Sequence, residues 1–198
     1  MKEIWKDVVD FEGYYEVSNK GNVRLNKNVL EKRDGRGCSH KVGKNLALRK
    51  SSVNIGPHGN KYTYCHIILR NGKKQKDEYI HRMVAKAFIP NPNNKPFVDH
   101  VNGDRSNNCV ENLRWCTRSE NGANRKKQNK RKTGQTSSKY KGVQRLKGED
   151  HANKPWKMTL SHQNKLYSQT FKTEKEAAQA YNEKALEIFG EFASLNEI

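Results

Sequence analysis

The segment from Gly122 to Ser138 divides the chain and limits how it can fold. It carries six basic and no acidic side chains, and Asn, Gln, Ser and Thr make up most of the remainder. A stretch of this composition cannot bury enough apolar surface to fold by itself. We therefore predict a basic linker over residues 122–138, with separately folded lobes on either side of it.

The rest of the chain is also poor in core-forming residues. Only 33% of all 198 residues are apolar, whereas an ordinary globular domain has about 45 to 50%. Small lobes therefore suit the chain better than one large core. Its apolar runs are far shorter than the roughly 20 residues that a helix needs to cross a bilayer, and the N-terminus lacks the apolar centre of a signal peptide. We expect a soluble, cytoplasmic protein.

The charge of the chain points to a polyanionic partner. Its 39 Lys and Arg residues outnumber 21 Asp and Glu residues, which leaves a formal net charge of +18. Basic side chains that neutralise phosphates release condensed counterions and gain affinity for any nucleic acid. An anionic membrane is the alternative, but it would require a basic amphipathic helix or a lipidation site, and neither is evident. We therefore expect nucleic acid and no membrane as the partner.

The four cysteines do not have the spacing of a metal site. Cys38, Cys65, Cys109 and Cys116 include no Cys-x-x-Cys pair. Without a signal peptide they are expected to stay reduced. Thiolates can join a histidine around zinc, but a structural zinc ion is not expected here, and we interpret the four residues as small apolar side chains.

Apolar periodicity predicts short strands before residue 78 and a helix after it. Residues 14–25 have a strand, turn, strand pattern, and residues 62–69 are β-branched and aromatic enough for a further strand that leads into an Asn-Gly hairpin signal. From Glu78 to Phe88, apolar residues recur at steps of three and four, which predicts a helix. His81 is interpreted as a packed histidine, with a DNA contact as the alternative.

Residues 97–121 carry the most informative pattern. Two short apolar strands flank an Asn-rich loop, and a Thr-x-x-Glu capping box then begins a helix. A strand, loop, strand, helix unit of this kind can bring Asp99, His100 and Asn121 together although they are distant in sequence.

Those three side chains suit the hydrolysis of a phosphodiester bond. The reaction needs a base that takes a proton from water, and the neutral imidazole of His100 is the natural candidate. It also needs a hard cation on the scissile phosphate and the departing 3′ oxygen. Mg²⁺ or Mn²⁺ prefers oxygen ligands, which the Asp99 carboxylate and the Asn121 amide would supply. Asn112 can bond backbone groups across the loop and so fix the strand that presents the base.

These residues resemble the HNH homing endonucleases of the ββα-metal type. The shared pattern over residues 99–121 is Asp-His-x-Asn-Gly, eight residues, Asn-Leu-x-Trp, five residues and Asn. The resemblance implies that His100, Asn112 and Asn121 belong to the catalytic set, and that Asp99 and Asn121 bind one divalent metal. It also implies cleavage of double-stranded DNA at a long, imperfectly read site. A relic that binds DNA without cutting it is the alternative.

Both flanking regions resemble modules that accompany such nucleases. Residues 4–24 are similar to a small nuclease-associated modular motif, which would either add Lys20 and Arg24 to the DNA footprint or serve as a packing hairpin. Residues 138–196 resemble the APETALA-type, ethylene-response-factor-like DNA-binding domain. That resemblance implies a three-stranded antiparallel sheet packed on one helix, with the open face of the sheet in the major groove.

The predicted DNA contacts follow from these features. Trp156 and Met158 share one face of a strand, so Lys157 lies on the other. The contacts expected in the C-terminal lobe are Lys141, Gln144, Arg145, Lys157, Thr159 and Tyr167. In the linker, two basic clusters either keep the segment solvated or follow a phosphate backbone. These clusters are Arg125, Lys126, Lys127, Lys130, Arg131 and Lys132.

The sequence thus predicts a multi-domain α+β protein. The expected parts are an N-terminal β module over 1–60, a ββα-metal unit over 61–121, the linker over 122–138 and an APETALA-type domain over 139–198. Its predicted function is site-specific cleavage of duplex DNA by a monomer or a dimer, on the nucleoid or in a phage-infected cell. A DNA-binding regulator without catalysis is the competing interpretation. An RNA-binding protein is a third, although A-form RNA hides its major groove from a sheet.

Overall fold

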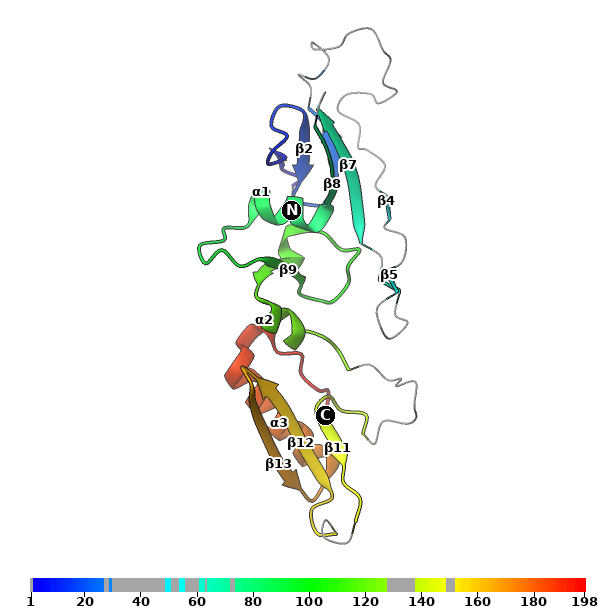
Figure 1. The fold of residues 1–198 in the computed structure, drawn as a ribbon, viewed down its shortest axis with the longest axis vertical. Helices are drawn as coiled ribbons and strands as arrows, with labels where there is room; N and C mark the ends of the chain where they lie inside the picture. The colour runs from blue at the N-terminus through cyan, green and yellow to red at the C-terminus, as the bar shows by residue number, and fades with distance from the viewer. Residues whose placement is uncertain are drawn as a thin grey trace. The chain divides into compact units, whose positions relative to one another are not determined.

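The structure is a computed structural model that describes residues 2–26, 29, 49–50, 54–55, 61–62, 64–71, 74–127, 138–148 and 152–198. The chain forms two compact units, Met1–Cys116 and Thr117–Ile198 (Figure 1). Several small sheets and few helices confirm a mixed α+β fold, whereas the predicted four-part division of the chain stays a prediction. Within the described residues, no helix has the length and apolar character needed to cross a membrane.

The first unit begins with a small antiparallel sheet, which confirms the predicted strand, turn, strand pattern. Its strands, in spatial order, are β1 (Trp5–Asp7), β2 (Tyr15–Ser18) and β3 (Val23–Leu25). The turn between β2 and β3 closes on the Ser18 hydroxyl oxygen, which accepts hydrogen bonds from the N–H groups of Lys20 at 3.2 Å and Asn22 at 3.0 Å. Gly21 completes this turn with a φ of +81°, a conformation that favours glycine.

A second antiparallel sheet leads into the first helix. Its strands, in spatial order, are β4 (Arg49–Lys50), β7 (Cys65–Asn71) and β8 (Lys74–Tyr79), and the short strands β5 (Asn54–Ile55) and β6 (Lys61–Tyr62) pair with each other. The predicted helix is confirmed as α1 (Ile80–Phe88), whose apolar side faces the core. It ends where the Ile89 N–H bonds to the Ala85 carbonyl, just before Pro90, a residue that cannot continue a helix.

A two-stranded sheet at the end of this unit is the hairpin that carries the informative pattern. Strands β9 (Phe97–His100) and β10 (Leu113–Cys116) are antiparallel, with Asp99 opposite Arg114 and His100 opposite Leu113. A long loop joins them and ends in the 3₁₀-helix η2 (Val110–Asn112). The two predicted strands on either side of an Asn-rich loop are therefore confirmed.

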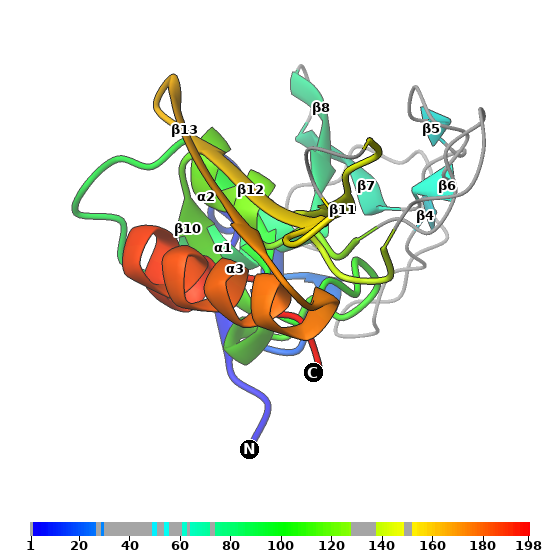
Figure 2. The same ribbon diagram turned by 90° about the horizontal axis from the view of Figure 1, so that it is seen from below.

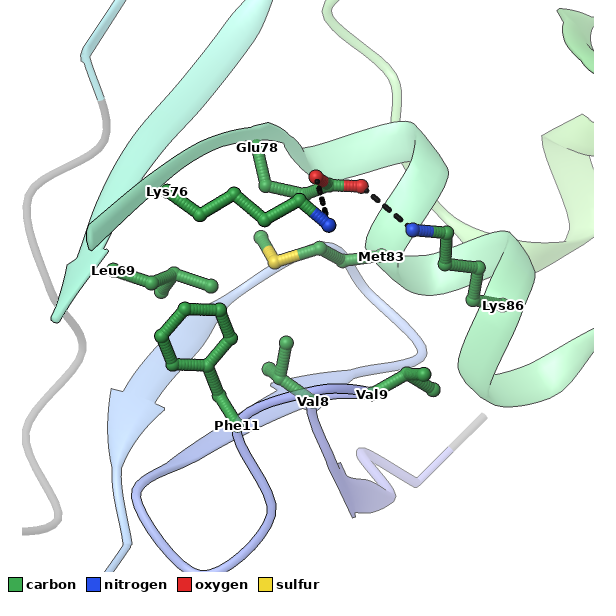
Figure 3. A pocket seen from close by; sticks show the side chains of 8 residues that line it. All are labelled: Val8, Val9, Phe11, Leu69, Lys76, Glu78, Met83 and Lys86. Carbon is green, nitrogen blue, oxygen red and sulfur yellow. Dashed lines mark hydrogen bonds and ion pairs between the residues drawn. The ribbon is translucent and has the colours of Figure 1, made fainter. Parts of the chain in front are cut away.

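The N-terminal sheet shares one hydrophobic core with the helix and the hairpin. Val8 and Phe11, which lie between β1 and β2, face Leu69 of β7 and Met83 of α1 (Figure 3). The Glu78 carboxylate covers the edge of this region and pairs with two lysine ammonium groups. The N-terminal β module is therefore packed into the same unit as α1 and the β9–β10 hairpin rather than folded apart from them.

The second unit contains one sheet and one long helix. Its elements are α2 (Arg118–Ala123), β11 (Val143–Arg145), β12 (Trp156–His162), β13 (Lys165–Phe171), α3 (Glu174–Phe189) and the 3₁₀-helix η4 (Gly190–Phe192). The sheet order is β11-β12-β13, and α3 runs across one face of it (Figure 2). Both predicted capping boxes are confirmed, at Thr117 for α2 and at Thr173 for α3. Gly142 leaves room for the Tyr181 ring, because a Cβ there would lie 2.1 Å from it.

Candidate active site

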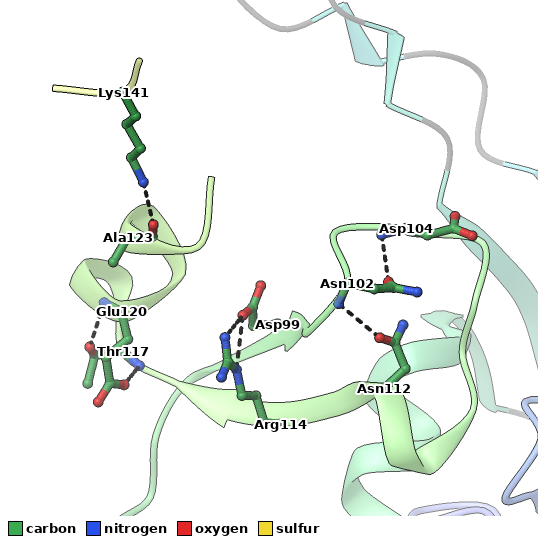
Figure 4. A network of polar contacts seen from close by, with 9 residues as sticks. All are labelled: Asp99, Asn102, Asp104, Asn112, Arg114, Thr117, Glu120, Ala123 and Lys141. Carbon is green, nitrogen blue, oxygen red and sulfur yellow. Dashed lines mark hydrogen bonds and ion pairs between the residues drawn. The ribbon is translucent and has the colours of Figure 1, made fainter. Parts of the chain in front are cut away.

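Side-chain amides hold the loop between β9 and β10 together. The Asn112 Oδ1 atom accepts the N–H of Asn102 at 3.0 Å, and its Nδ2 atom donates to the carbonyl of Asn107 at 2.8 Å (Figure 4). The main chain adds a hydrogen bond from the Val101 N–H to the Asn112 carbonyl at 2.8 Å. Asn112 is itself buried, so it fixes the loop to the end of the strand that presents His100.

His100 is buried where β9 meets this loop, with 5% of its surface exposed. Its Nε2 atom lies 3.1 Å from Oδ1 of Asn108, whose Nδ2 atom donates to the Ser106 carbonyl at 3.2 Å. Burial lowers the pKa of His100, although the hydrogen bond to Asn108 and the charge of Asp99 oppose that shift. The imidazole is therefore neutral at neutral pH, as a general base must be.

Two further rings surround His100. The ring centroid of His81 lies 5.2 Å from that of His100, and Tyr64 lies 5.1 Å from His81 and 6.3 Å from His100. Burial lowers the pKa of His81 to about 3, and the nearby His100 adds to that effect. Among the described residues, the buried His81 Nδ1 atom has no hydrogen-bond partner. His81 is thus a packed histidine, as the sequence indicates.

Asp99 precedes His100 on β9, and successive side chains of a strand point to opposite faces. Its carboxylate is buried, and Oδ2 accepts hydrogen bonds from Arg114 Nη2 at 3.0 Å and Nε at 3.2 Å (Figure 4). Arg114 is the residue directly opposite on β10. The cross-strand register therefore orients the carboxylate with a charge-assisted pair.

The predicted metal ligands have the right chemistry for a hard divalent cation. Asp99 offers carboxylate oxygen and Asn121 offers an amide oxygen, the ligand types that Mg²⁺ takes together with water and substrate phosphate. Asp99 belongs to the first unit, whereas Asn121 lies half-buried on α2 in the second. Within its own unit, Asn121 is fixed by a bond from its N–H to the Thr117 carbonyl at 3.0 Å.

The two predicted DNA contacts of the N-terminal sheet differ in their surroundings. Lys20 is exposed at the turn. The Arg24 guanidinium instead lies 4.0 Å from the Trp5 ring centroid, and its Nε atom pairs with the Glu16 carboxylate at 2.7 Å. Arg24 therefore already has partners within its own sheet, whereas Lys20 points to solvent.

The basic cluster after α2 is described only in part. Arg125 and Lys126 are exposed. Lys127 donates from Nζ to the carbonyls of Ser138 and Tyr140, the latter at 2.7 Å. The other cluster, Lys130, Arg131 and Lys132, lies outside the described residues, as does Cys38.

Strand pairing sorts the predicted contacts of the C-terminal sheet onto two faces. Gln144 pairs with Lys157, and these two share the face away from α3 with Thr159. Tyr167 pairs with the buried Leu160 and packs against the core on the α3 side, away from the face of Gln144, and its predicted DNA contact stays a prediction. The two-residue turn between β12 and β13 sets this register, which the sequence pattern of either strand alone does not give.

Two other predicted contacts have partners in the second unit. Arg145 lies opposite Trp156, on the α3 side, with its guanidinium carbon 5.9 Å from that ring. Lys141 donates from Nζ to the Ala123 carbonyl at 2.6 Å (Figure 4). Burial lowers the pKa of Lys141 to about 8. DNA contacts at these two positions stay predictions.

The sequence alone does not identify the residues that surround His100. Asn108 lies within hydrogen-bonding distance of the His100 ring, and the Tyr64 ring packs near it. The Arg105 guanidinium lies 4.9 Å from the Tyr64 ring centroid. Arg105 and Asn108 lie among the eight residues between Gly103 and Asn112 whose identities the pattern leaves open, and Tyr64 lies outside the pattern. The repeated Asn residues of the loop indicate that one of their amides bonds to a buried group. They do not indicate which Asn residue it is.

Comparisons with known proteins agree with the pattern of residues 99–121. Residues 78–123 match a family model described as HNH endonuclease, and residues 3–47 match the NUMOD4 motif. An uncharacterized HNH endonuclease of Acanthamoeba polyphaga mimivirus is 40% identical over 120 residues, which are 60% of this chain and 32% of that protein. DNA endonuclease I-HmuI of Bacillus phage SP01 is 32% identical over 117 residues, which are 59% of this chain and 54% of that enzyme.

A solved structure, described as DNA binding and cleavage by the HNH homing endonuclease I-HmuI, is similar with a TM-score of 0.44 and 34% identity. The similarity covers 61% of this chain and 56% of that one. This chain therefore spans about a third to about half of the length of these relatives. The resemblance of residues 138–196 to an APETALA-type domain stays a prediction.

Proposed function

We propose that this chain is a homing-type HNH endonuclease that hydrolyses phosphodiester bonds of double-stranded DNA. The observation that carries the proposal is a buried, neutral His100 at the end of β9, within the segment that matches the HNH endonuclease family. The phage relative is named a DNA endonuclease, which supports DNA as the substrate. A net charge of +18 is consistent with a polyanionic partner.

In the proposed reaction, His100 is the general base. Its neutral imidazole takes a proton from water while the water oxygen bonds to phosphorus. The bond from phosphorus to the 3′ oxygen breaks, and that oxygen takes a proton from solvent, which leaves a 5′ phosphate and a 3′ hydroxyl. Asn112 supports this step indirectly, because it fixes the loop that follows the base. General base catalysis of this kind contributes about 10²-fold to 10⁴-fold to a rate.

Asp99 and Asn121 are the proposed ligands of one Mg²⁺ or Mn²⁺ ion. When bound, the cation would stabilise the negative charge that grows on the phosphate and the departing oxygen. Arg114 orients the Asp99 carboxylate through its two hydrogen bonds. Asn121 is presented by the first turns of α2, whose start is fixed by the Thr117 capping box.

Residues 139–198 of the second unit are proposed to read DNA as an APETALA-type domain. Gln144, Lys157 and Thr159 share its open sheet face, and a sheet can enter the major groove. A DNA-binding domain that is tethered to a nuclease domain binds DNA at a high effective concentration. Several modest DNA contacts can therefore together select a cleavage site. We propose a monomer as the acting species, with a dimer as the alternative, and which of the two acts decides whether one strand or both strands are cut.

A supercoiled-plasmid assay with Mg²⁺ tests the proposed activity. The chain should give nicked or linear product that disappears with a chelator and with His100→Ala. His66→Ala is the matched control, because His66 lies on β7 in an exposed pair with Asp77 that contributes little. The control should cleave as the unchanged protein does.

Binding without cleavage would point to a different function. If the protein retards duplex DNA but cuts no sequence in a genomic library, it is a DNA-binding regulator, and the nuclease proposal is wrong. Preference for duplex RNA over duplex DNA in a competition experiment would also contradict it.

A further inference from the structure

The N-terminal turn packs directly on the loop that carries the partner of His100. The Val110 N–H donates to the Asn19 carbonyl at 2.8 Å, which ties the loop to the turn. Gly21 lies against Asn108 so closely that a Cβ on the glycine would be 2.9 Å from the Asn108 Cβ and 3.2 Å from its carbonyl oxygen. The turn therefore sets the position of Asn108.

The turn is itself held by buried polar groups. Asn19 accepts the Ile4 N–H on Oδ1 at 2.9 Å and donates its own N–H to the Ile4 carbonyl at 3.0 Å. Its Nδ2 atom donates to the Lys2 carbonyl at 3.3 Å. Ser18, which is fully buried, accepts the Asn22 N–H at 3.0 Å. These bonds leave the turn little freedom, because breaking any of them would leave a buried polar group without its partner.

The hydrogen bonds of Asn108 determine which nitrogen of His100 carries the proton. The Asn108 Nδ2 atom donates to the Ser106 carbonyl at 3.2 Å, so its Oδ1 atom is the oxygen that faces His100. An amide oxygen can only accept, and the Nε2 atom 3.1 Å away must therefore be the donor. In a neutral imidazole the lone pair is then on Nδ1, and Nδ1 is the nitrogen that can take a proton.

We infer that Asn108 is a positioning residue that holds His100 in the tautomer protonated at Nε2, and that the Asn19–Gly21 turn holds Asn108 in place. The inference rests on the proposed function, since a fixed tautomer serves a histidine that accepts a proton at one defined atom. It assigns the N-terminal module a role in the chemistry, because the turn of this module holds Asn108, and Asn108 in turn holds the His100 ring. A base in the wrong tautomer presents an N–H where it should present a lone pair.

Two substitutions of Asn108 test the first half of the inference. Asn108→Ala removes the acceptor, whereas Asn108→Asp keeps an oxygen at the same place. The tautomer is measured in the full chain without DNA, from the nitrogen chemical shifts of the His100 ring. Asn108→Ala should lose the single Nε2-protonated form and lower kcat by about 10-fold to 100-fold with little change in KM. Asn108→Asp should keep the tautomer and most of the activity.

The outcomes separate this inference from the proposed function. An Nε2-protonated His100 that persists in Asn108→Ala would overturn the inference even if the protein cleaves DNA. A protein that cleaves no DNA, but whose tautomer changes in Asn108→Ala alone, would support the assignment of Asn108 and contradict the proposed nuclease. Equal loss of the tautomer in both variants would show that the acceptor oxygen is not its cause, and would also overturn the inference.

A pair of glycine substitutions tests the second half. Gly21 and Gly13 have φ of +81° and +73°, so alanine is strained to a similar extent at both positions. A Cβ on Gly21 would collide with Asn108, whereas one on Gly13 meets no described atom within 4 Å. Gly21→Ala should therefore disturb the His100 tautomer and lower kcat, and Gly13→Ala should do neither. Equal behaviour of the two variants would show that the turn does not act through Asn108.

Discussion

The loop around His100 and the open face of the β11–β13 sheet use their polar side chains in opposite ways. Asp99 and His100 at the end of β9, and Asn108 and Asn112 in the loop that follows, are buried and bonded to other protein groups. On the sheet, Gln144 and Ser168 are exposed. A buried polar group costs free energy unless every bond is made, whereas an exposed one is available to a partner. Substitutions in the loop should therefore change chemistry or stability, and those on the sheet should change affinity.

The largest expected effect separates chemistry from binding at His100. His100→Ala should lower the cleavage rate by about 10²-fold to 10⁴-fold, because the proposed general base is lost. Affinity for DNA should stay nearly unchanged, since the side chain is 5% exposed and offers little contact surface. Single-turnover cleavage and a mobility shift on the same duplex measure the two quantities. A variant that cuts normally would remove the basis for the proposed mechanism.

The next effect concerns the stability of the hairpin. Arg114→Ala would leave the buried Asp99 carboxylate without its arginine, and removal of one partner from a buried pair costs about 3 to 5 kcal/mol. Arg24→Ala is the comparison, because the Arg24 and Glu16 side chains are 21% and 19% exposed. Its expected cost is about 1 kcal/mol. Urea unfolding followed by the amide signals of β9 and β10 measures the difference, and equal costs would contradict the role given to burial.

Local patterns in the sequence were sufficient for the elements of both regions. The capping boxes at Thr117 and Thr173 require only residues three positions apart, and both helices begin where these boxes predict. The apolar period of α1 and the pairing of β9 with β10 were also found, because each depends on short segments. The general-base role of His100 rests on residues close to it in sequence and stays a prediction.

The omissions depend on contacts between distant segments. Asn108 reaches His100 only after the loop has closed, and Gly21 reaches Asn108 only once the N-terminal sheet has joined the same core. The face of the sheet on which Tyr167 lies is likewise set by the turn after β12, which pairs it with Leu160 on the α3 side. Spacing along the chain does not contain these distances. The sequence therefore predicts helices, strands and the types of functional residues more readily than it predicts the partners of a buried side chain.

A smaller effect links the stability of the first unit to pH through His81. Its pKa is about 3 in the folded chain against an ordinary 6.5, so the folded state binds a proton less readily than the unfolded state. Stability is therefore retained above pH 6.5 and lost as the pH falls, by about 2 kcal/mol at pH 5. His81→Phe should lose less, since its ring never takes a proton. Unfolding free energies at pH 7.5 and pH 5 test this, and an equal loss in the variant would assign the effect to other groups.

The smallest effect distinguishes two lysines of the second unit. Lys157 lies on the open face, so Lys157→Ala should flatten the slope of log affinity against log salt by about 0.9, the value for one phosphate contact. Lys141 instead donates to the Ala123 carbonyl at 2.6 Å, and its pKa of about 8 reflects burial. Lys141→Ala should leave the salt slope unchanged and lower the stability of this unit. If both variants change the slope equally, the Lys141 ammonium leaves that carbonyl for a phosphate when DNA binds, and its predicted DNA contact is confirmed.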